Sequence, residues 1–168
     1  MDTEMKSRIL KGSIITGFIN ALINGGIQYF FLKNETPIAI SVDSITNNED
    51  TVLGATVTLA ITLAMILTVI AYFNIKDNKK PFFPSVFWLT LKHGFFTFGV
   101  ITSLAVLWQR YMGTVEVSLA AALVTIGVIA GIVSAVVNYL TIKGCVISKN
   151  TPTPLSKTEF PKHIKSLS

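Results

Sequence analysis

The feature that most constrains this chain is a set of long runs without a single charged side chain. Residues 12–32 give 21 uncharged positions in a row, residues 52–73 give 22, and residues 117–142 give 26. A helix needs about 20 mainly apolar residues to cross the ~30 Å hydrocarbon core of a bilayer. Packing into a soluble core does not produce several uncharged runs of this length, so the sequence predicts membrane-spanning helices.

A further span is predicted from a shorter run. Residues 94–109 give only 16 uncharged positions, which correspond to about 24 Å of helix. Extending this helix back past His93 and Lys92 gives a sufficient length, because a lysine side chain can reach from the span to the headgroups. Pro81 and Pro84 mark its start, since proline is tolerated in the first turn of a helix.

These segments predict an all-α polytopic membrane protein with four transmembrane helices in two antiparallel hairpins. The expected spans are about 9–32, 52–74, 86–111 and 116–142, within a transmembrane domain of residues 1–147. Residues 148–168 are polar, include three prolines and have no helical period, so we expect a disordered cytoplasmic tail. In the first outer loop, Ile38, Ile40 and Val42 alternate with other residues and predict a short strand or interfacial segment.

The distribution of basic residues predicts the orientation. If the N-terminus is cytoplasmic, 12 of the 14 Lys and Arg residues lie on the cytoplasmic side, and only Lys33 and Arg110 lie outside. Basic residues are enriched in cytoplasmic loops of membrane proteins. We therefore expect a multi-pass protein of the plasma (inner) membrane with both termini in the cytoplasm.

Composition argues against several functions. None of the nine acidic residues lies inside an uncharged run, and only Glu116 stands at the edge of a predicted span, whereas ion-coupled carriers usually place a carboxylate within the membrane. In size the chain resembles the four-span small multidrug transporters, but it lacks their membrane-embedded glutamate, so their activity does not carry over. One cysteine, two histidines and no paired carboxylates predict no enzyme, no metal and no cofactor. We read the net charge of +5 as an orientation signal, with the bilayer as partner and no nucleic acid.

The first span carries an unusual polar face. At 100° per residue, its polar and small residues fall within an arc of about 120°, opposite Ile14, Phe18 and Leu22. An unpaired amide in hydrocarbon costs several kcal/mol, so this face must meet other helices, another subunit or water. It is either structural glue between helices or the lining of a hydrated or ligand-binding cavity. Its members are Ser13, Thr16, Gly17, Asn20, Asn24 and Gln28.

The fourth span offers a matching seam of small and polar residues. Gly127 and Gly131 form a GxxxG pair, which lets helix backbones approach closely. Ser134, Asn138 and Thr141 continue the seam within an arc of about 80°. By depth, we expect hydrogen bonds in the bundle centre that join Asn20 and Asn24 to the second span, and Thr16 to the other inner residues. The partners expected are Thr58, Thr62, Thr97 and Asn138.

A weak internal echo suggests a duplication. Lys11, Thr16 and Gln28 align without gaps with Lys92, Thr97 and Gln109, and the second and fourth spans end in similar tripeptides at 74–76 and 141–143. Two hairpins that enter from the same side would form parallel repeats, as in some transporters.

Two function classes fit this sequence. The first is a permease-like protein for a neutral or polar solute, working as an oligomer, because one four-helix bundle has little interior space. The second is a non-catalytic partner or regulatory subunit that docks another membrane protein through its polar helix faces. His93 is expected among the headgroups or in a polar corner with Thr90 and Thr97.

Overall fold

The computed structural model describes residues 3–35, 37–42, 51–76 and 79–146. The predicted tail lies outside these described residues. The helices are α1 (Thr3–Leu32), α2 (Val52–Phe73), α3 (Phe87–Met112) and α4 (Leu119–Cys145), and the short strands are β1 (Ile38–Ile40) and β2 (Val115–Val117). A short turn, η2 (Phe82–Val86), leads into α3.

Each of the four helices is long and apolar enough to cross a membrane. Helices suit this environment because they satisfy every backbone hydrogen bond within one segment. Hydroxyl groups cap two of them: the Thr51 side chain accepts a bond from the Gly54 amide, and the Ser118 side chain accepts one from the Ala121 amide. Gly113 ends α3 with a φ of 70°, a conformation that glycine adopts readily.

Two helix starts differ from the expected spans. α1 begins at Thr3 rather than near residue 9, because Lys6, Arg8 and Lys11 continue the helix beyond its uncharged run and Arg8 pairs with Glu4 one turn away. α4 begins at Leu119 rather than residue 116, because the residues just before it form strand β2.

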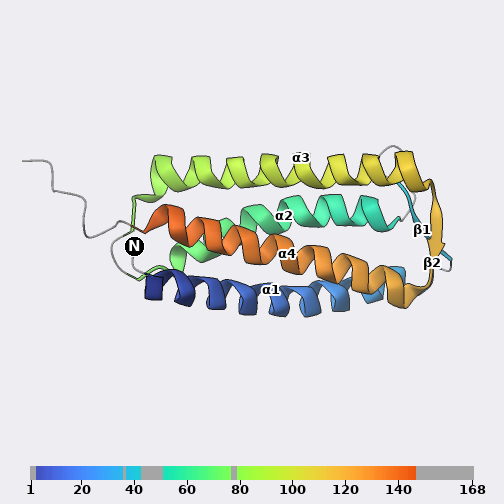
Figure 1. The fold of residues 1–168 in the computed structure, drawn as a ribbon, viewed down its shortest axis with the longest axis horizontal. Coiled ribbons are helices and arrows are strands. Elements are labelled where there is room, and N and C mark those ends of the chain that lie inside the picture. Colours follow the sequence, from blue (N-terminus) through green and yellow to red (C-terminus); the bar gives the residue numbers. More distant parts are fainter. Residues whose placement is uncertain (1–2, 36, 43–50, 77–78, 147–168) are drawn as a thin grey trace, which may run out of the picture.

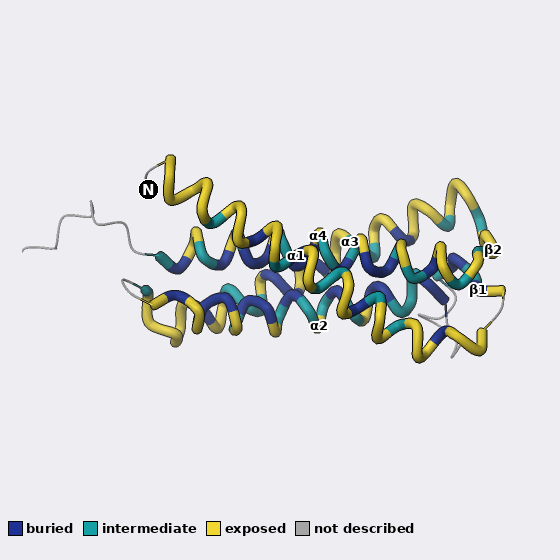
Figure 2. The backbone as a smooth tube through the Cα atoms, turned by 90° about the horizontal axis from the view of Figure 1, so that it is seen from below, coloured by how far each residue is buried: buried dark blue, intermediate teal, exposed yellow. Residues whose placement is uncertain are grey.

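Successive helices run in alternating directions, and α1 begins at the same end of the bundle where α4 ends (Figure 1). The helices do not, however, pack as two separate hairpins. α2 and α4 lie together in the centre, α1 packs along α4, and α3 packs along α2. The prediction of hairpins as packing units is therefore wrong, although their antiparallel direction holds. Figure 2 shows the consequence, with α1 largely exposed along its length.

A two-stranded antiparallel sheet lies at the end of the bundle where α1 leads into α2 and α3 leads into α4. β1 pairs with β2 so that Ile38 faces Val117 and Ile40 faces Val115. Ile38 and Ile40 are buried, and they pack with Leu32, Val52 and Ile126 in one apolar cluster. The predicted strand at residues 38–40 is thus confirmed, whereas its partner β2 was not anticipated. The sheet ties the α1–α2 connection to the α3–α4 connection.

The packing has an internal two-fold relation. The unit α1–β1–α2 corresponds to α3–β2–α4, because α1 packs on α4 as α3 packs on α2, and β1 pairs with β2. Residues 77 positions apart correspond in the first helix and strand of each unit, and residues 70 positions apart correspond in the second helix. Residues 55–71 match residues 125–141 as buried, half-buried or exposed at every pair except Leu63 and Val133.

The glycine contacts follow the same correspondence. A Cβ on Gly17 would lie 2.9 Å from Cβ of Ala135, and a Cβ on Gly94 would lie 2.9 Å from Cγ of Met65. Gly94 lies 77 positions after Gly17, and Ala135 lies 70 positions after Met65, so both pairs of residues correspond. The sequence alignment that pairs Lys11 with Lys92 is shifted from this structural correspondence. The shift is four residues, or about one helical turn. The repeat is therefore one of packing geometry, and the residue matches seen in the sequence are not its basis.

Candidate functional site

The polar face of α1 is turned toward the protein. Ser13, Gly17 and Asn24 are buried, whereas Ile14 and Phe18 on the opposite side are exposed. This arrangement agrees with the expectation that the amides cannot face lipid.

Small residues bring α1 and α4 into close contact. A Cβ on Gly131 would lie 3.1 Å from the Gly17 carbonyl oxygen, and one on Gly127 would lie 3.1 Å from the Ala21 carbonyl oxygen. This is the close backbone approach that a GxxxG pair permits. It places Asn138 beside α1, where the Asn138 side-chain amide donates a 3.0 Å hydrogen bond to the Ser13 hydroxyl.

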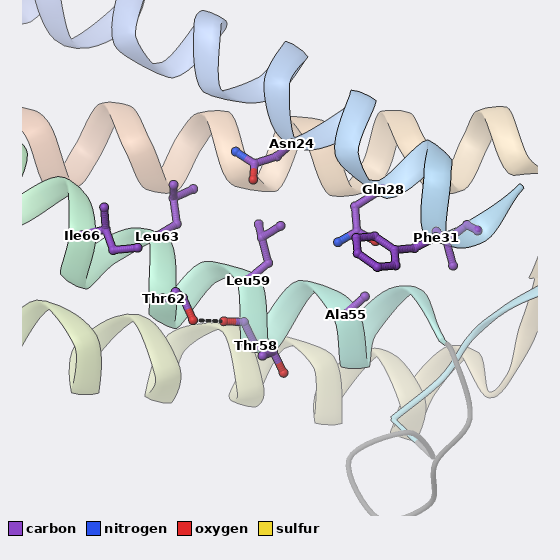
Figure 3. A pocket seen from close by; sticks show the side chains of 10 residues that line it. Asn24, Gln28, Phe31, Ala55, Thr58, Leu59, Thr62, Leu63 and Ile66 are labelled. Carbon is purple, nitrogen blue, oxygen red and sulfur yellow. Dashed lines mark hydrogen bonds between the residues drawn. The ribbon is translucent and has the colours of Figure 1, made fainter.

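A cleft of about 500 Å³ separates α1 from α2 on the other side of the polar face. Asn24 and Gln28 reach into it from α1, and Thr58 and Thr62 line it from α2 (Figure 3). Thr58 and Thr62 are exposed, so the cleft opens at the surface of the bundle. Its apolar lining is Phe31, Leu32, Ala55, Leu59, Leu63 and Ile66.

In the described part of the chain, Asn20 and Asn24 make no hydrogen bond to α2, so this expectation is wrong. The Asn20 amide donates to the Thr16 carbonyl at 2.9 Å, and the Asn24 amide donates to the Asn20 carbonyl at 2.8 Å. The physical reason is that α1 packs on α4 and not on α2, so the cleft separates α1 from α2. Gln28 makes no hydrogen bond to another described residue. The side-chain oxygens of these amides therefore remain free to accept hydrogen bonds from an occupant.

The hydroxyl groups of the predicted set mostly satisfy themselves within their own helices. Thr16 donates to the Gly12 carbonyl, Thr62 to the Thr58 carbonyl and Ser134 to the Ala130 carbonyl, at 2.6–3.0 Å. Ser134 is buried on α4 and does not line the cleft. Thr97 is buried on α3 and lines a different groove, between α3 and α4. The structure therefore gathers Asn24, Gln28, Thr58 and Thr62 at the cleft and leaves the other predicted residues outside it.

A second polar cluster was missed by the sequence reasoning. His93 is buried on α3, its Nδ1 atom lies 2.8 Å from the Thr68 hydroxyl of α2, and the Thr141 hydroxyl of α4 lies 3.5 Å away. The expectation of a headgroup histidine, or of a corner with Thr90 and Thr97, is therefore wrong, because the α3 face that carries His93 turns inward. The cluster links three helices, and its burial indicates a packing role. A usable signal was the presence of Thr68 and Thr141 near the ends of the two central helices.

The internal two-fold relation provides a comparison for the cleft. At the corresponding positions of α3 and α4, Asn24, Gln28, Thr58 and Thr62 are replaced by the apolar residues Ile101, Ala105, Val128 and Ile132. Ile101 and Ile132 line the groove between α3 and α4. Because the same helix arrangement forms with apolar residues at these positions, the fold does not require the polar ones. Their presence at the cleft is therefore a difference between the two units that the packing of the helices does not explain.

Four apolar helices of membrane-spanning length define this chain as a multi-pass membrane protein. No protein-family model, no curated protein and no solved structure matches it. Within the described ranges, no group of three His, Cys, Asp or Glu side chains could hold a metal ion. The chemistry available at the cleft is therefore that of neutral hydrogen-bonding groups.

Proposed function

We propose that the α1–α2 cleft binds a small uncharged polar solute and that the protein gives this solute a permease-like route through the membrane. One observation supports this most directly: two amides and two hydroxyls line a cleft of about 500 Å³, whereas the equivalent groove is apolar. Two amides offer both donors and acceptors. Each neutral hydrogen bond contributes about 0.5–1.5 kcal/mol, so binding would be weak and reversible, as a facilitator requires.

The absence of charge at the cleft favours a neutral solute over an ion. Its lining residues are all uncharged, and transfer of an unpaired ion into this environment would be strongly unfavourable. The leucines and isoleucine beside the hydroxyls would contact the apolar part of a solute. A second copy packed against the open side of the cleft would enclose it, so we propose a homo-oligomer as the working form.

A second candidate function has its own supporting observation. α1 contacts the bundle mainly through α4, which leaves its cleft side open along Asn24 and Gln28. A membrane helix of another protein could fill this space and supply the missing hydrogen bonds. In that case the chain would be a partner or regulatory subunit, and no solute would cross.

We further propose that both ends of the chain face the cytoplasm. The support is the distribution of basic residues: among the described residues, eight lie toward the helix ends near Lys11 and Lys143, and two lie toward the small sheet. In this orientation the cleft lies toward the outer half of the membrane, because it is lined by the last turns of α1 and the first turns of α2.

Transport can be tested in vesicles by stopped-flow light scattering, with urea and glycerol as neutral polar probes. The wild-type protein should raise the permeability for at least one probe, and the Asn24→Leu/Thr62→Val variant should lower it at least fivefold. The matched control is Ile101→Leu/Ile132→Val, at the equivalent positions of the apolar groove, which should retain wild-type permeability.

Permeability equal to that of empty vesicles for both probes would reject this solute class. The partner function would then be supported if the wild-type protein, but not the Asn24→Leu/Thr62→Val variant, co-purified with one defined membrane protein. Equal effects of the two double variants would show that the cleft has no special role.

A further inference from the structure

A groove runs between α3 and α4. These two helices barely contact one another, and the space between them holds about 240 Å³. It extends from His93 to Leu104 along α3, which is about 16 Å of helix, or about half the thickness of the hydrocarbon core. Its main lining residues are Phe96, Val100, Leu104, Ile132, Val136 and Leu140.

A lysine stands at the same end of both groove walls. On α3, Lys92 precedes Phe96 and Val100 at four-residue spacing, so the three share one helix face. On α4, Lys143 follows Leu140 at three-residue spacing on the face that also carries Val136. Both lysines are exposed, and the end they share is where α3 begins and α4 ends. The groove is therefore one apolar slot of leaflet length, with a lysine beyond its end on each of the two helices that form its walls.

The α1–α2 cleft shows the reverse distribution. By the two-fold correspondence, Ile15 stands in place of Lys92 and Phe73 in place of Lys143. α1 and α2 thus carry apolar residues at the two positions where α3 and α4 carry lysines. A two-fold repeat by itself would give both sites the same character. Because their residues differ, the two sites suit ligands of different chemistry.

We propose that the α3–α4 groove binds an anionic phospholipid of the surrounding leaflet. One acyl chain lies along the apolar walls, and the headgroup phosphate pairs with the ammonium groups of Lys92 and Lys143. Anionic lipid attracts basic residues beside a membrane helix, and lysine stems can lie along apolar surface while the charge reaches the headgroups. This site is independent of what the α1–α2 cleft binds.

The test is native mass spectrometry of the detergent-purified full chain after addition of phosphatidylglycerol or, in parallel, phosphatidylcholine. The wild-type protein should retain phosphatidylglycerol at least fivefold more than phosphatidylcholine. The Lys92→Gln/Lys143→Gln variant should lose about tenfold in phosphatidylglycerol retention. Lys6→Gln/Lys11→Gln removes two cations from α1 at the same end of the bundle, and it should change retention less than twofold.

A second variant tests the apolar slot without altering charge. Val136→Phe should fill the groove and reduce phosphatidylglycerol retention by a similar factor, while circular dichroism shows an unchanged helix content. If the lysine variant does not fold, Val136→Phe decides alone, and unchanged retention in it overturns the proposal. Equal retention of the two lipids by the wild-type protein, or equal losses in the two lysine double variants, would also overturn it.

Discussion

Gly17 of α1 lies so close to Gly131 of α4 that a Cβ atom on Gly17 would stand 2.6 Å from the Gly131 carbonyl oxygen. The obstacle is backbone, which cannot rotate away as a side chain can. This contact sets the crossing of α1 over α4, brings Ser13 to Asn138, and leaves the other side of α1 facing the cleft. The position of the candidate site therefore depends on glycine at both Gly17 and Gly131.

Replacing Gly17 by alanine should weaken the α1–α4 contact. The extra methyl group forces the two backbones apart, and overpacking of this kind costs about 1–3 kcal/mol. Thermal unfolding in detergent should show a midpoint several degrees lower, by rough conversion of that loss. Gly26→Ala is the matched control on the same helix, because nothing lies within 4 Å of its Cβ position. Equal midpoints for the two variants would contradict the contact.

The corresponding glycine in the second unit should tolerate alanine better. A Cβ on Gly94 would meet Cγ of Met65 at 2.9 Å and its sulfur at 3.2 Å, and a methionine side chain can change rotamer. Gly94→Ala should therefore cost less than Gly17→Ala. In a double-mutant cycle, Met65→Ala should offset part of the loss, so strictly additive effects would argue against this contact.

The hydrogen bond between Ser13 and Asn138 should be measurable as a coupling energy. A double-mutant cycle of Ser13→Ala and Asn138→Leu should give about 0.6–1.7 kcal/mol, the range for such bonds between membrane helices. Thr16→Val serves as the control, because the Thr16 hydroxyl bonds to the Gly12 carbonyl of its own helix. Thr16→Val and Asn138→Leu should be additive, and a larger coupling for that pair would reject the assignment.

The proposed orientation can be tested with single cysteines. In a Cys145→Ala background, Lys6→Cys should react with a membrane-impermeant maleimide only after intact cells are permeabilised. Tyr111→Cys, in a strongly exposed position at the opposite end, should react without permeabilisation. The reversed pattern would place the ends of the chain outside, and it would also move the lipid site to the other leaflet.

Much of the architecture follows from the sequence alone. The uncharged runs identified four helices, and the alternation at Ile38 and Ile40 identified strand β1. The spacing of Ser13, Gly17 and Asn24 showed which face of α1 needs a partner. Periodicity gives the face of a helix but not the neighbour that covers it, so the packing of α1 on α4 could not be read from spacing.

The polar residues show the same division. Asn24 and Thr58 were expected to share hydrogen bonds, but the structure separates their helices and leaves a cleft between them. His93 next to Lys92 resembled an interfacial residue, yet it is buried against Thr68. In both cases the outcome depends on the rotation and separation of helices, which many distant contacts decide together.

By itself, the sequence determined the number and approximate extent of the spans, because a bilayer admits only segments that are apolar and internally hydrogen-bonded. The tertiary structure decided which helices touch. Close packing at Gly17 and Gly131, and the strand pair that joins the two loops, select one arrangement among several that hydrophobicity permits. That arrangement places polar residues in the α1–α2 cleft and apolar residues in the α3–α4 groove, and this difference becomes visible only when the packing of the two units is compared.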